Sequence, residues 1–380
     1  MALDRIFNVA DARRMAKRTV PRVVFDYIDG GAEDEVTMHE NVAAFRELTF
    51  RPRMATDAAR PDLATTLFGT PLSMPVVLAP CGLVRLMHPD GAIGVARAAA
   101  DARIVSVLST VAGTAPEDVA EASSGPKWFQ LYKLGDLDAA DELTERAKSA
   151  GYEALVITID TNVLGKRERD LRHGVSIPLR VGVREAMRIG PQMAARPRWA
   201  AAYVRQQLDQ RRSGVERRNV PDMDQSPYTW ADIEHIRGRW SGPLLVKGVL
   251  TGDDARRSIQ AGADGVIVSN HGGRQLEGAP ATIRVLGEVV GAVGSEAVVL
   301  VDGGVRRGGD VIKAVALGAD GVLIGRPYLY GLAAGGQAGV TRILELLRAE
   351  MTRTMALIGC ASVSALDRGW LALDGTSAKT

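Results

Sequence analysis

The sequence predicts a single α/β domain folded as a closed (β/α)8 TIM barrel, and three observations support this fold class. Eight short apolar runs recur along the 380 residues, each ending at Gly, Pro, Asn, Asp or another polar residue. The runs are apolar almost throughout, which is typical of parallel strands buried on both faces. Segments with helical periodicity separate most of them, as in repeated α/β units. An open doubly wound sheet is the less favoured alternative.

The predicted elements follow one another in a regular order. The strands are PVVLAP (75–80), IVSVLST (104–110), WFQLY (128–132), ALVITID (154–160), PLLVKG (243–248), GVIVSN (265–270), VVLVDGG (298–304) and GVLIGRP (321–327). The Ala-rich helical segments are 91–102, 138–151, 253–264 and 309–320. Two insertions interrupt the repeat, namely an N-terminal helical extension (1–74) and an insert or lid (176–228) between strands four and five. Connections as long as this insert are usually functional.

Composition places the chain among ordinary globular proteins. An apolar fraction of 46% with 24% charged residues argues against disorder, and a net charge of +2 gives no sign of a nucleic-acid partner. Two cysteines cannot form a disulfide framework, so we expect a reducing cytoplasm. The N-terminus lacks the apolar core of a signal peptide, and no apolar stretch reaches the length of a membrane span.

Polar side chains gather where the predicted strands end. In a TIM barrel the active site lies at the C-terminal ends of the strands. Hydrogen-bonding or titratable groups occur at seven of the eight ends: Ser109, Gln130, Tyr132, Thr158, Asp160, Lys247, Ser269, His271, Asp302 and Arg326. This concentration predicts an active site at that end of the barrel. No cluster of His, Cys and carboxylates has metal-ligand spacing, so we expect no metal.

Glycine-rich turns after the last two strands indicate a phosphate site. Strand seven ends in DGGVRRGGD (302–310) and strand eight in IGRP (324–327). Glycines let backbone N–H groups approach an anion, and Arg306 and Arg326 add charge-assisted contacts. TIM barrels usually bind phosphate there, although ordinary turns with surface arginines remain possible. No GxGxxG follows the first strand, so a Rossmann dinucleotide site is not predicted.

The other polar strand ends suit a flat heterocycle lying across the barrel mouth. Ser109, Gln130 and Thr158 supply neutral donors and acceptors on neighbouring strands. Lys247 would point into the mouth, where a lysine serves as a Schiff-base nucleophile or as the positive partner of an electron-rich ring. A lysine that merely extends towards solvent is the alternative for this residue.

Several motifs resemble the FMN-dependent L-2-hydroxy acid dehydrogenase and oxidase family. They are FDYIDGGAEDE (25–35), FQLY (129–132), TID (158–160) with RERD (167–170), LVKG (245–248), SNHGGRQL (269–276) and LVDGGVRRGGDVIKAVALGADGVLIGRP (300–327). The resemblance covers nearly the whole chain and is weakest across 176–228. Within the family, the (S)-mandelate and L-lactate dehydrogenases are most similar to this sequence and glycolate oxidase comes next.

The resemblance implies that the heterocycle with its phosphate is FMN. It nominates residues on most strands of the barrel as its binding site: Ala79, Pro80, Cys81, Gly82, Ser109, Gln130, Thr158, Lys247, Ser269, Asp302, Gly303, Gly304, Arg306, Gly325 and Arg326. Lys247 would lie by the N1/O2 edge of the flavin and favour its reduced anion. His271 would be the base that takes the α-proton or the hydroxyl proton. Asp160 would orient the imidazole and stabilise the imidazolium.

The same resemblance implies a binding site for a small 2-hydroxy acid. Arg274 and Arg167, with the Tyr27 hydroxyl, would bind the substrate carboxylate, because a guanidinium can pair with that planar anion through two hydrogen bonds. Tyr132 would hydrogen-bond the substrate oxygen at the reacting carbon. The lone residues also have ordinary structural interpretations, such as a helix cap for Asp160 or a charge run for Arg167.

Three positions indicate substrate size and electron acceptor. Val111 stands where glycolate oxidase has a tryptophan, and Leu164 would form another pocket wall. The smaller side chain favours lactate, longer aliphatic or mandelate-like hydroxy acids. Gly82 replaces an alanine of glycolate oxidase. We take it to favour a dehydrogenase that passes electrons to quinone or another carrier over an oxidase that makes hydrogen peroxide. A non-catalytic barrel that binds FMN or phosphate is the alternative of another class.

The insert is chemically distinct from the rest of the chain. Between Arg180 and Arg218 it carries ten arginines and three acidic residues, with Trp199 and Tyr203 among interleaved apolar residues. A basic amphipathic segment of this kind suits an anionic membrane surface, which predicts a peripheral enzyme on the cytoplasmic face. An active-site lid is the alternative, and a nucleic-acid patch is disfavoured because stacking aromatics are few. The family resemblance also implies a homotetramer or a multiple of it.

Overall fold

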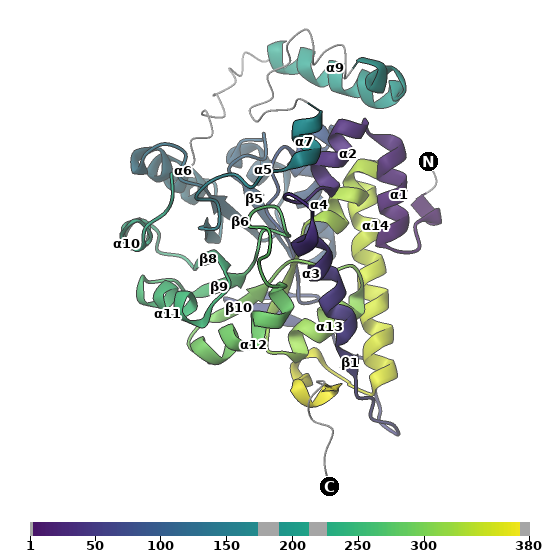
Figure 1. Ribbon diagram of the computed structural model, residues 1–380, viewed down its shortest axis with the longest axis vertical. Helices are drawn as coiled ribbons and strands as arrows, with labels where there is room; N and C mark the ends of the chain where they lie inside the picture. The colour runs from purple at the N-terminus through teal and green to yellow at the C-terminus, as the bar shows by residue number, and fades with distance from the viewer. Residues whose placement is uncertain (1–2, 174–189, 213–225, 373–380) are drawn as a thin grey trace.

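A closed barrel of eight parallel strands forms the centre of the computed structural model (Figure 1). The structure describes residues 3–173, 190–212 and 226–372. The strands are β4 (Val76–Leu78), β5 (Val105–Ser109), β6 (Lys127–Leu131), β7 (Ala154–Thr158), β8 (Leu244–Val249), β9 (Gly265–Val268), β10 (Val298–Val301) and β11 (Gly321–Ile324). They pair in chain order, and β11 closes on β4. Each strand overlaps one predicted apolar run, so the TIM-barrel prediction is confirmed and the open sheet is excluded.

Helices surround the barrel and alternate with its strands. They are α4 (Gly91–Ala102), α5 (Pro116–Ala122), α6 (Leu137–Ser149), α10 (Trp230–Arg239), α11 (Gly252–Gln260), α12 (Thr282–Val293), α13 (Gly308–Ala316) and α14 (Arg326–Ile358). The four predicted helices correspond to α4, α6, α11 and α13. Helix α14 begins directly after β11 and is interrupted at Gly335 and Gly336, whose backbone angles are not helical. Figure 1 shows it running along α1 on one side of the molecule.

The strands are buried on both faces, as their apolar runs predict. Inward-pointing side chains such as Val107, Val156 and Leu245 fill the barrel, while the outward faces pack on the helices. A hairpin of β2 (Thr65–Leu67) and β3 (Thr70–Leu72) contributes to the interior cluster. Phe68 at its tip packs on Trp128, near the start of β6, with ring centroids 5.9 Å apart. The hairpin therefore covers the N-terminal end of the barrel and leaves the C-terminal end for the site.

The N-terminal extension is helical, as predicted, but it also contains strands. Its helices are η1 (Leu3–Arg5), α1 (Val9–Thr19), α2 (Arg22–Asp29) and α3 (Val36–Glu47). The β2–β3 hairpin was not predicted, nor was β1 (Thr49–Phe50), which pairs with β12 (Leu371–Ala372). Runs of two or three residues are too short for a periodic pattern to reveal them.

The described part of the insert folds back towards the barrel. Helix α7 (Glu168–Arg172) precedes the insert and packs on α2, and within the insert α9 (Pro197–Arg212) lies at the top of Figure 1. The Trp199 indole donates to the Leu86 carbonyl at 2.8 Å and stacks on Tyr203. Arg180, Arg184, Arg188, Arg217 and Arg218 lie outside the described residues. Within the described ranges, no helix has the length and apolar character needed to cross a bilayer.

Candidate active site

A histidine and an aspartate meet at the C-terminal end of the barrel. His271 follows β9 in a tight turn with φ +57°, and its N–H donates to Ser269 Oγ at 3.0 Å. Its Nδ1 lies 2.9 Å from Oδ1 of Asp160, which follows β7. Burial lowers the pKa of His271, against the attraction of Asp160. The imidazole is therefore neutral at neutral pH, and with Nδ1–H donating to the aspartate its Nε2 has the free lone pair.

Asp160 remains ionised beside the imidazole. Burial opposes its ionisation, but the hydrogen bond from the His271 ring and the attraction of the Lys247 ammonium help to hold the pKa of Asp160 below its usual value. A fixed negative charge next to a neutral imidazole stabilises the imidazolium that forms when the ring takes a proton. The pair therefore has the geometry and charge of a general base.

Two guanidinium groups lie close to this pair. Arg274 Nη1 donates to the carbonyls of Tyr27 and Gly30, both at 2.8 Å, and its guanidinium lies 5.0 Å from the Tyr27 ring centroid. Arg167 Nε donates to the Arg274 carbonyl at 3.4 Å. Burial and the nearby Arg274 lower the pKa of Arg167 to about 10. Neither arginine forms an ion pair with a carboxylate of the described residues, so the two together suit a bound anion.

Two tyrosines, a glycine and a valine border the space next to the two guanidinium groups. The Tyr27 hydroxyl donates weakly to the Gly82 carbonyl at 3.4 Å, and a Cβ added to Gly82 would lie 3.0 Å from Val111 Cγ2. Burial raises the pKa of both Tyr27 and Tyr132, so both phenols stay neutral donors. Leu164 is 42% exposed, so it lies at the surface of the protein.

Seven buried side-chain polar atoms of the described residues have no hydrogen-bond partner. Besides Asp160 Oδ2, four of them lie at the mouth of the barrel: Gln130 Nε2, Thr158 Oγ1, Asp302 Oδ1 and Arg326 Nε. Such atoms normally form hydrogen bonds, and these four follow or end barrel strands at one end. They fit a bound molecule with polar edges. A flavin, its ribityl chain and its phosphate require donors and acceptors of these kinds.

A buried lysine lies between these groups. Lys247 Nζ donates to Ser269 Oγ at 2.7 Å and lies 3.1 Å from Asp302 Oδ2. Burial opposes its charge, but Asp302 and Asp160 outweigh burial and raise the pKa of Lys247. The charged ammonium is therefore favoured, which argues against the alternative of a neutral amine nucleophile. Ser109 Oγ donates to Gln130 Oε1 at 2.7 Å and completes this side of the site.

The turns after β10 and β11 form a positively charged pocket edge. Gly303 and Gly304 have φ of +87° and +86°, and a Cβ on Gly304 would lie 1.9 Å from the Asn41 carbonyl oxygen. Arg326, the first residue of α14, donates through Nη1 to Gly272 O and through Nη2 to Gly30 O, both at 2.8 Å. Burial lowers its pKa to about 10. A helix N-terminus with an arginine suits a phosphate.

The remaining residues predicted to bind FMN lie around these groups. The Ala79 carbonyl, after β4, accepts from the Tyr328 hydroxyl at 2.9 Å. Cys81 packs against Gly325, and burial raises the pKa of its thiol, so the sulfur stays protonated. Arg306 Nη1 donates to the Val305 carbonyl at 2.8 Å. Pro80 precedes Cys81 at the mouth and is partly exposed.

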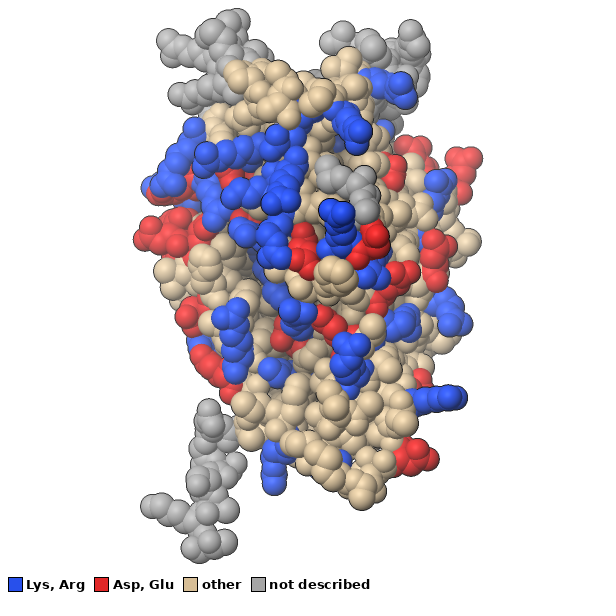
Figure 2. Space-filling model, turned by 90° about the vertical axis from the view of Figure 1, so that its right-hand side faces the viewer, with Lys and Arg blue, Asp and Glu red and all other residues tan. Residues whose placement is uncertain are grey.

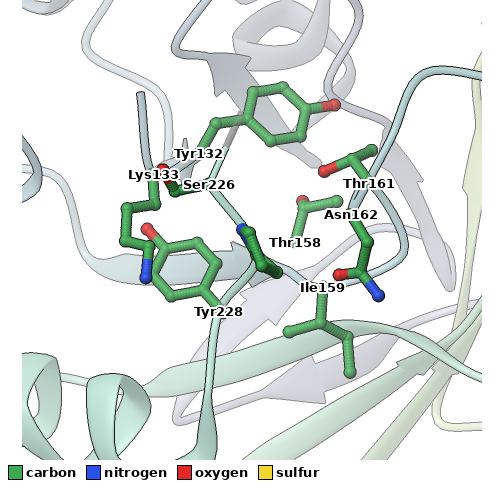
Figure 3. Close-up of a pocket in the computed structure, with 9 residues that line it drawn as sticks. Tyr132, Lys133, Thr158, Ile159, Thr161, Asn162, Ser226 and Tyr228 are labelled. Carbon is green, nitrogen blue, oxygen red and sulfur yellow. The ribbon is translucent and has the colours of Figure 1, made fainter. Parts of the chain in front are cut away.

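A narrow hollow lies beside Tyr132 (Figure 3). Thr158 and Thr161 line it from the end of β7, and Tyr228 and Lys133 lie next to each other on its other side. Lys133 Nζ lies 5.6 Å from the Tyr228 ring centroid and donates to Asp232 Oδ2 at 2.7 Å. The segment before α10 therefore closes the β6 and β7 side of the mouth, which the sequence did not predict.

An ionic network near α2 was also missed. Arg169 donates to Asp29 at 2.9 Å and to Glu35, while Arg13 and the Tyr330 hydroxyl also donate to Asp29. The network joins α7, whose preceding residue is Arg167, to α2, which carries Tyr27. Its members lie within RERD and FDYIDGGAEDE, but alternating charges in a sequence resemble a solvated surface, so the pattern alone gave no signal.

The fold and the site together define a class of protein. A TIM barrel whose mouth holds a histidine–aspartate base, two guanidinium groups for an anion and the donor set for a flavin is a flavin-dependent oxidoreductase acting on a carboxylate-bearing substrate. The chain belongs to the FMN-dependent dehydrogenase family, whose model matches residues 16–373. FMN is therefore its cofactor, and it oxidises the CH–OH group of 2-hydroxy acids. The predicted family, cofactor and enzyme class are confirmed.

Relatives within the family include both oxidases and dehydrogenases. A peroxisomal (S)-2-hydroxyacid oxidase, GLO3 of Arabidopsis thaliana, is 40% identical over 96% of each chain. Glycolate oxidase 5 of Oryza sativa subsp. japonica is 41% identical over 96% of this chain and 95% of its own. The structure also resembles that of the monotopic membrane protein (S)-mandelate dehydrogenase, with a TM-score of 0.88 and 38% identity over 97% of this chain and 99% of that one.

Proposed function

We propose that this enzyme oxidises an L-2-hydroxy acid larger than glycolate to the 2-oxo acid and passes the electrons to quinone or another carrier. The observation that carries the proposal is the His271–Asp160 pair beside two guanidinium groups without carboxylate partners among the described residues. A base next to an anion site matches a substrate whose hydroxyl-bearing carbon adjoins its carboxylate. The active domain in this proposal is the whole chain, 1–380, with the extension and the insert as parts of it.

Each polar group then has a part in the reaction. Arg274 and Arg167, with the Tyr27 hydroxyl, bind the substrate carboxylate, and the Tyr132 hydroxyl donates to the oxygen on the reacting carbon. His271 Nε2 takes a proton from that carbon or from its hydroxyl. When bound, FMN accepts the two electrons of the oxidation.

The flavin site in this proposal follows the strand ends. Ser109, Gln130, Thr158 and Lys247 hold the ring, and Ser269 and Asp302 hold the chain that leads from it. Gly303, Gly304, Arg306, Gly325 and Arg326 bind the phosphate. Ala79, Pro80, Cys81 and Gly82 lie along the remaining edge. The support for this site is the four unpartnered polar atoms on Gln130, Thr158, Asp302 and Arg326.

Three residues support the substrate size and the acceptor. Val111 and Gly82 are small and lie side by side near Tyr27, which leaves space for a substrate side chain. Leu164 would border that space. Structural neighbours at 38% identity include a mandelate dehydrogenase and a mandelate oxidase with a TM-score of 0.82. We favour a lactate-like or mandelate-like acid and a dehydrogenase, with an oxidase that makes hydrogen peroxide as the second candidate.

Anaerobic mixing of the FMN-loaded protein with L-mandelate, L-lactate or glycolate tests this function. We expect the flavin to lose its absorbance with the first two acids faster than with glycolate, because the space near Val111 accepts a larger side chain. The bleached protein should then regain its colour slowly in air and rapidly with a soluble quinone. Rapid recovery in air would favour the oxidase. A flavin that keeps its colour with every hydroxy acid would contradict the enzyme function and leave a non-catalytic FMN-binding barrel.

We further propose that the enzyme is a homotetramer or a multiple of it and binds the cytoplasmic face of an anionic membrane through residues 180–218. The similarity to a monotopic membrane protein, (S)-mandelate dehydrogenase, supports the membrane part of this proposal. Figure 2 shows lysine and arginine gathered in the upper half of the face that α1 presents. The exposed basic residues of α1 and of the start of α2 are Arg13, Arg14, Lys17, Arg18 and Arg22.

Vesicle sedimentation tests the membrane proposal. The protein should sediment with vesicles rich in phosphatidylglycerol and much less with phosphatidylcholine vesicles, because basic residues near an anionic surface each contribute about 1 kcal/mol. Binding should weaken as salt rises, since salt screens these charges. A protein that stays in the supernatant with both kinds of vesicle at low salt would leave the insert as an active-site lid.

A further inference from the structure

We propose that Gln275 is a positioning residue that holds Arg167 and the backbone of Asp160 in register with the turn of His271 and Arg274. The inference rests on the proposed function, in which Arg167 binds the substrate carboxylate and Asp160 supports the base. Gln275 follows Arg274 directly, and its side chain crosses to the loop after β7.

The Gln275 amide makes four hydrogen bonds to that loop. Its Nε2 donates to the Asp160 carbonyl at 2.9 Å and to the Val163 carbonyl at 2.8 Å. Its Oε1 accepts from the Gly165 N–H at 3.1 Å and from Arg167 Nη2 at 3.2 Å. An amide has two N–H groups and two acceptor sites, so its capacity is fully used. The residue is only 8% exposed.

The loop after β7 is in direct contact with the turn that carries His271 and Arg274, so a shift of the loop would move Arg167 relative to that turn. A Cβ added to Gly165 would lie 2.4 Å from the Arg274 carbonyl oxygen and 2.7 Å from that of Gln275. Among the residues that the structure describes, the only other hydrogen bond of the Arg167 side chain is the 3.4 Å bond from its Nε to the Arg274 carbonyl. The Gln275 oxygen therefore fixes the direction in which the Arg167 guanidinium points, and leaves its other N–H groups for an anion.

The chemistry of this position requires an amide. A carboxylate has nearly the same shape but cannot donate to the Asp160 and Val163 carbonyls. It would also place a negative charge at hydrogen-bond distance from Arg167 and compete there with the substrate carboxylate. A methionine fills similar space and makes none of the four bonds. The two replacements thus separate the effect of charge from the effect of lost hydrogen bonds.

Gln275→Glu and Gln275→Met in the FMN-loaded protein test the inference, with exposed Gln260→Glu as the matched control. Oxalate, which carries carboxylates but has no C–H to oxidise, is the probe, and its binding is followed through the flavin spectrum. We expect its dissociation constant to rise about tenfold or more in both variants, and further in Gln275→Glu. Hydrogen exchange of segment 160–167 should accelerate in both, while the β5 and β9 amides and the bound flavin are retained.

The outcomes distinguish this inference from the function on which it rests. Oxalate binding within about twofold of the unmodified protein in both variants would overturn the role of Gln275. Weaker binding in Gln275→Met than in Gln275→Glu would also overturn it, because a residue that only supports the loop tolerates the isosteric carboxylate better. Failure of the unmodified protein to bind oxalate or to be reduced by any hydroxy acid would instead contradict the proposed function.

Discussion

Replacing His271 by Gln is expected to slow reduction of bound FMN by the hydroxy acid roughly 10²–10⁴-fold, the usual contribution of a positioned base. The glutamine amide can still donate to Asp160 but cannot take a proton at neutral pH. The flavin should stay bound, because its proposed contacts come from other residues. Anaerobic stopped-flow measurement of flavin absorbance checks both expectations, with exposed His39→Gln as the matched control. Near-normal reduction in the His271 variant would remove this residue from the role of base.

The pH dependence of the same step provides an independent check. The base must be neutral to take a proton, and burial lowers the pKa of His271 from its ordinary 6.5. In the unmodified enzyme the reduction rate should therefore stay high at pH 6.5, and should fall only when the pH drops through the lowered pKa. His271→Gln should lose this fall at acid pH. A rate that halves above pH 6.5 would contradict a base with a lowered pKa.

Replacing Arg274 by Met is expected to lower kcat/KM for the hydroxy acid by about 10²–10⁴-fold. The variant loses two charge-assisted hydrogen bonds to the substrate carboxylate, each worth about 1.5–3 kcal/mol. Steady-state kinetics with a quinone or dye acceptor measures the effect, and Arg256→Met, on the exposed face of α11, is the control.

The amide of the same substrate shows whether charge recognition is the cause. The unmodified enzyme should strongly prefer the acid to its uncharged amide, because in the proposed function Arg274 and Arg167 bind the carboxylate. In Arg274→Met this preference should shrink, since the amide never benefited from the guanidinium. A variant that loses activity but keeps the full preference would show that Arg274 supports the fold of the α2 end, where it holds the Tyr27 and Gly30 carbonyls.

The sequence predicted the barrel and much of the candidate site for one physical reason. Strands buried on both faces must be apolar, so a polar side chain at the end of such a run, such as Lys247 or Ser269, stands out. The end of a parallel strand also fixes where that side chain lies, which places Asp160 and His271 at the same end of the barrel. The family resemblance added the expectation that the two residues meet. Their contact at 2.9 Å agrees with that expectation, while their catalytic roles stay predictions.

The rest depended on contacts that no local pattern contains. Gln275 and Arg169 form hydrogen bonds with partners more than a hundred residues away in the sequence. In the sequence alone, a glutamine or an arginine at these positions looks like an ordinary surface residue. The β2–β3 hairpin is too short for alternation to be visible. Tyr228 closes one side of the mouth from a segment whose sequence gives no sign of where it packs.

The Gly30 carbonyl oxygen limits how the barrel of this enzyme can be exchanged with that of a related enzyme. It accepts hydrogen bonds from both Arg274 and Arg326, so one atom of the extension links the proposed substrate and phosphate arginines. Those partly buried guanidinium groups would lose a shared acceptor if the extension were absent. The eight-stranded barrel therefore cannot be transferred alone. A chimera made by exchanging barrels between relatives must include the C-terminal end of α2, with Gly30, together with β9 and α14.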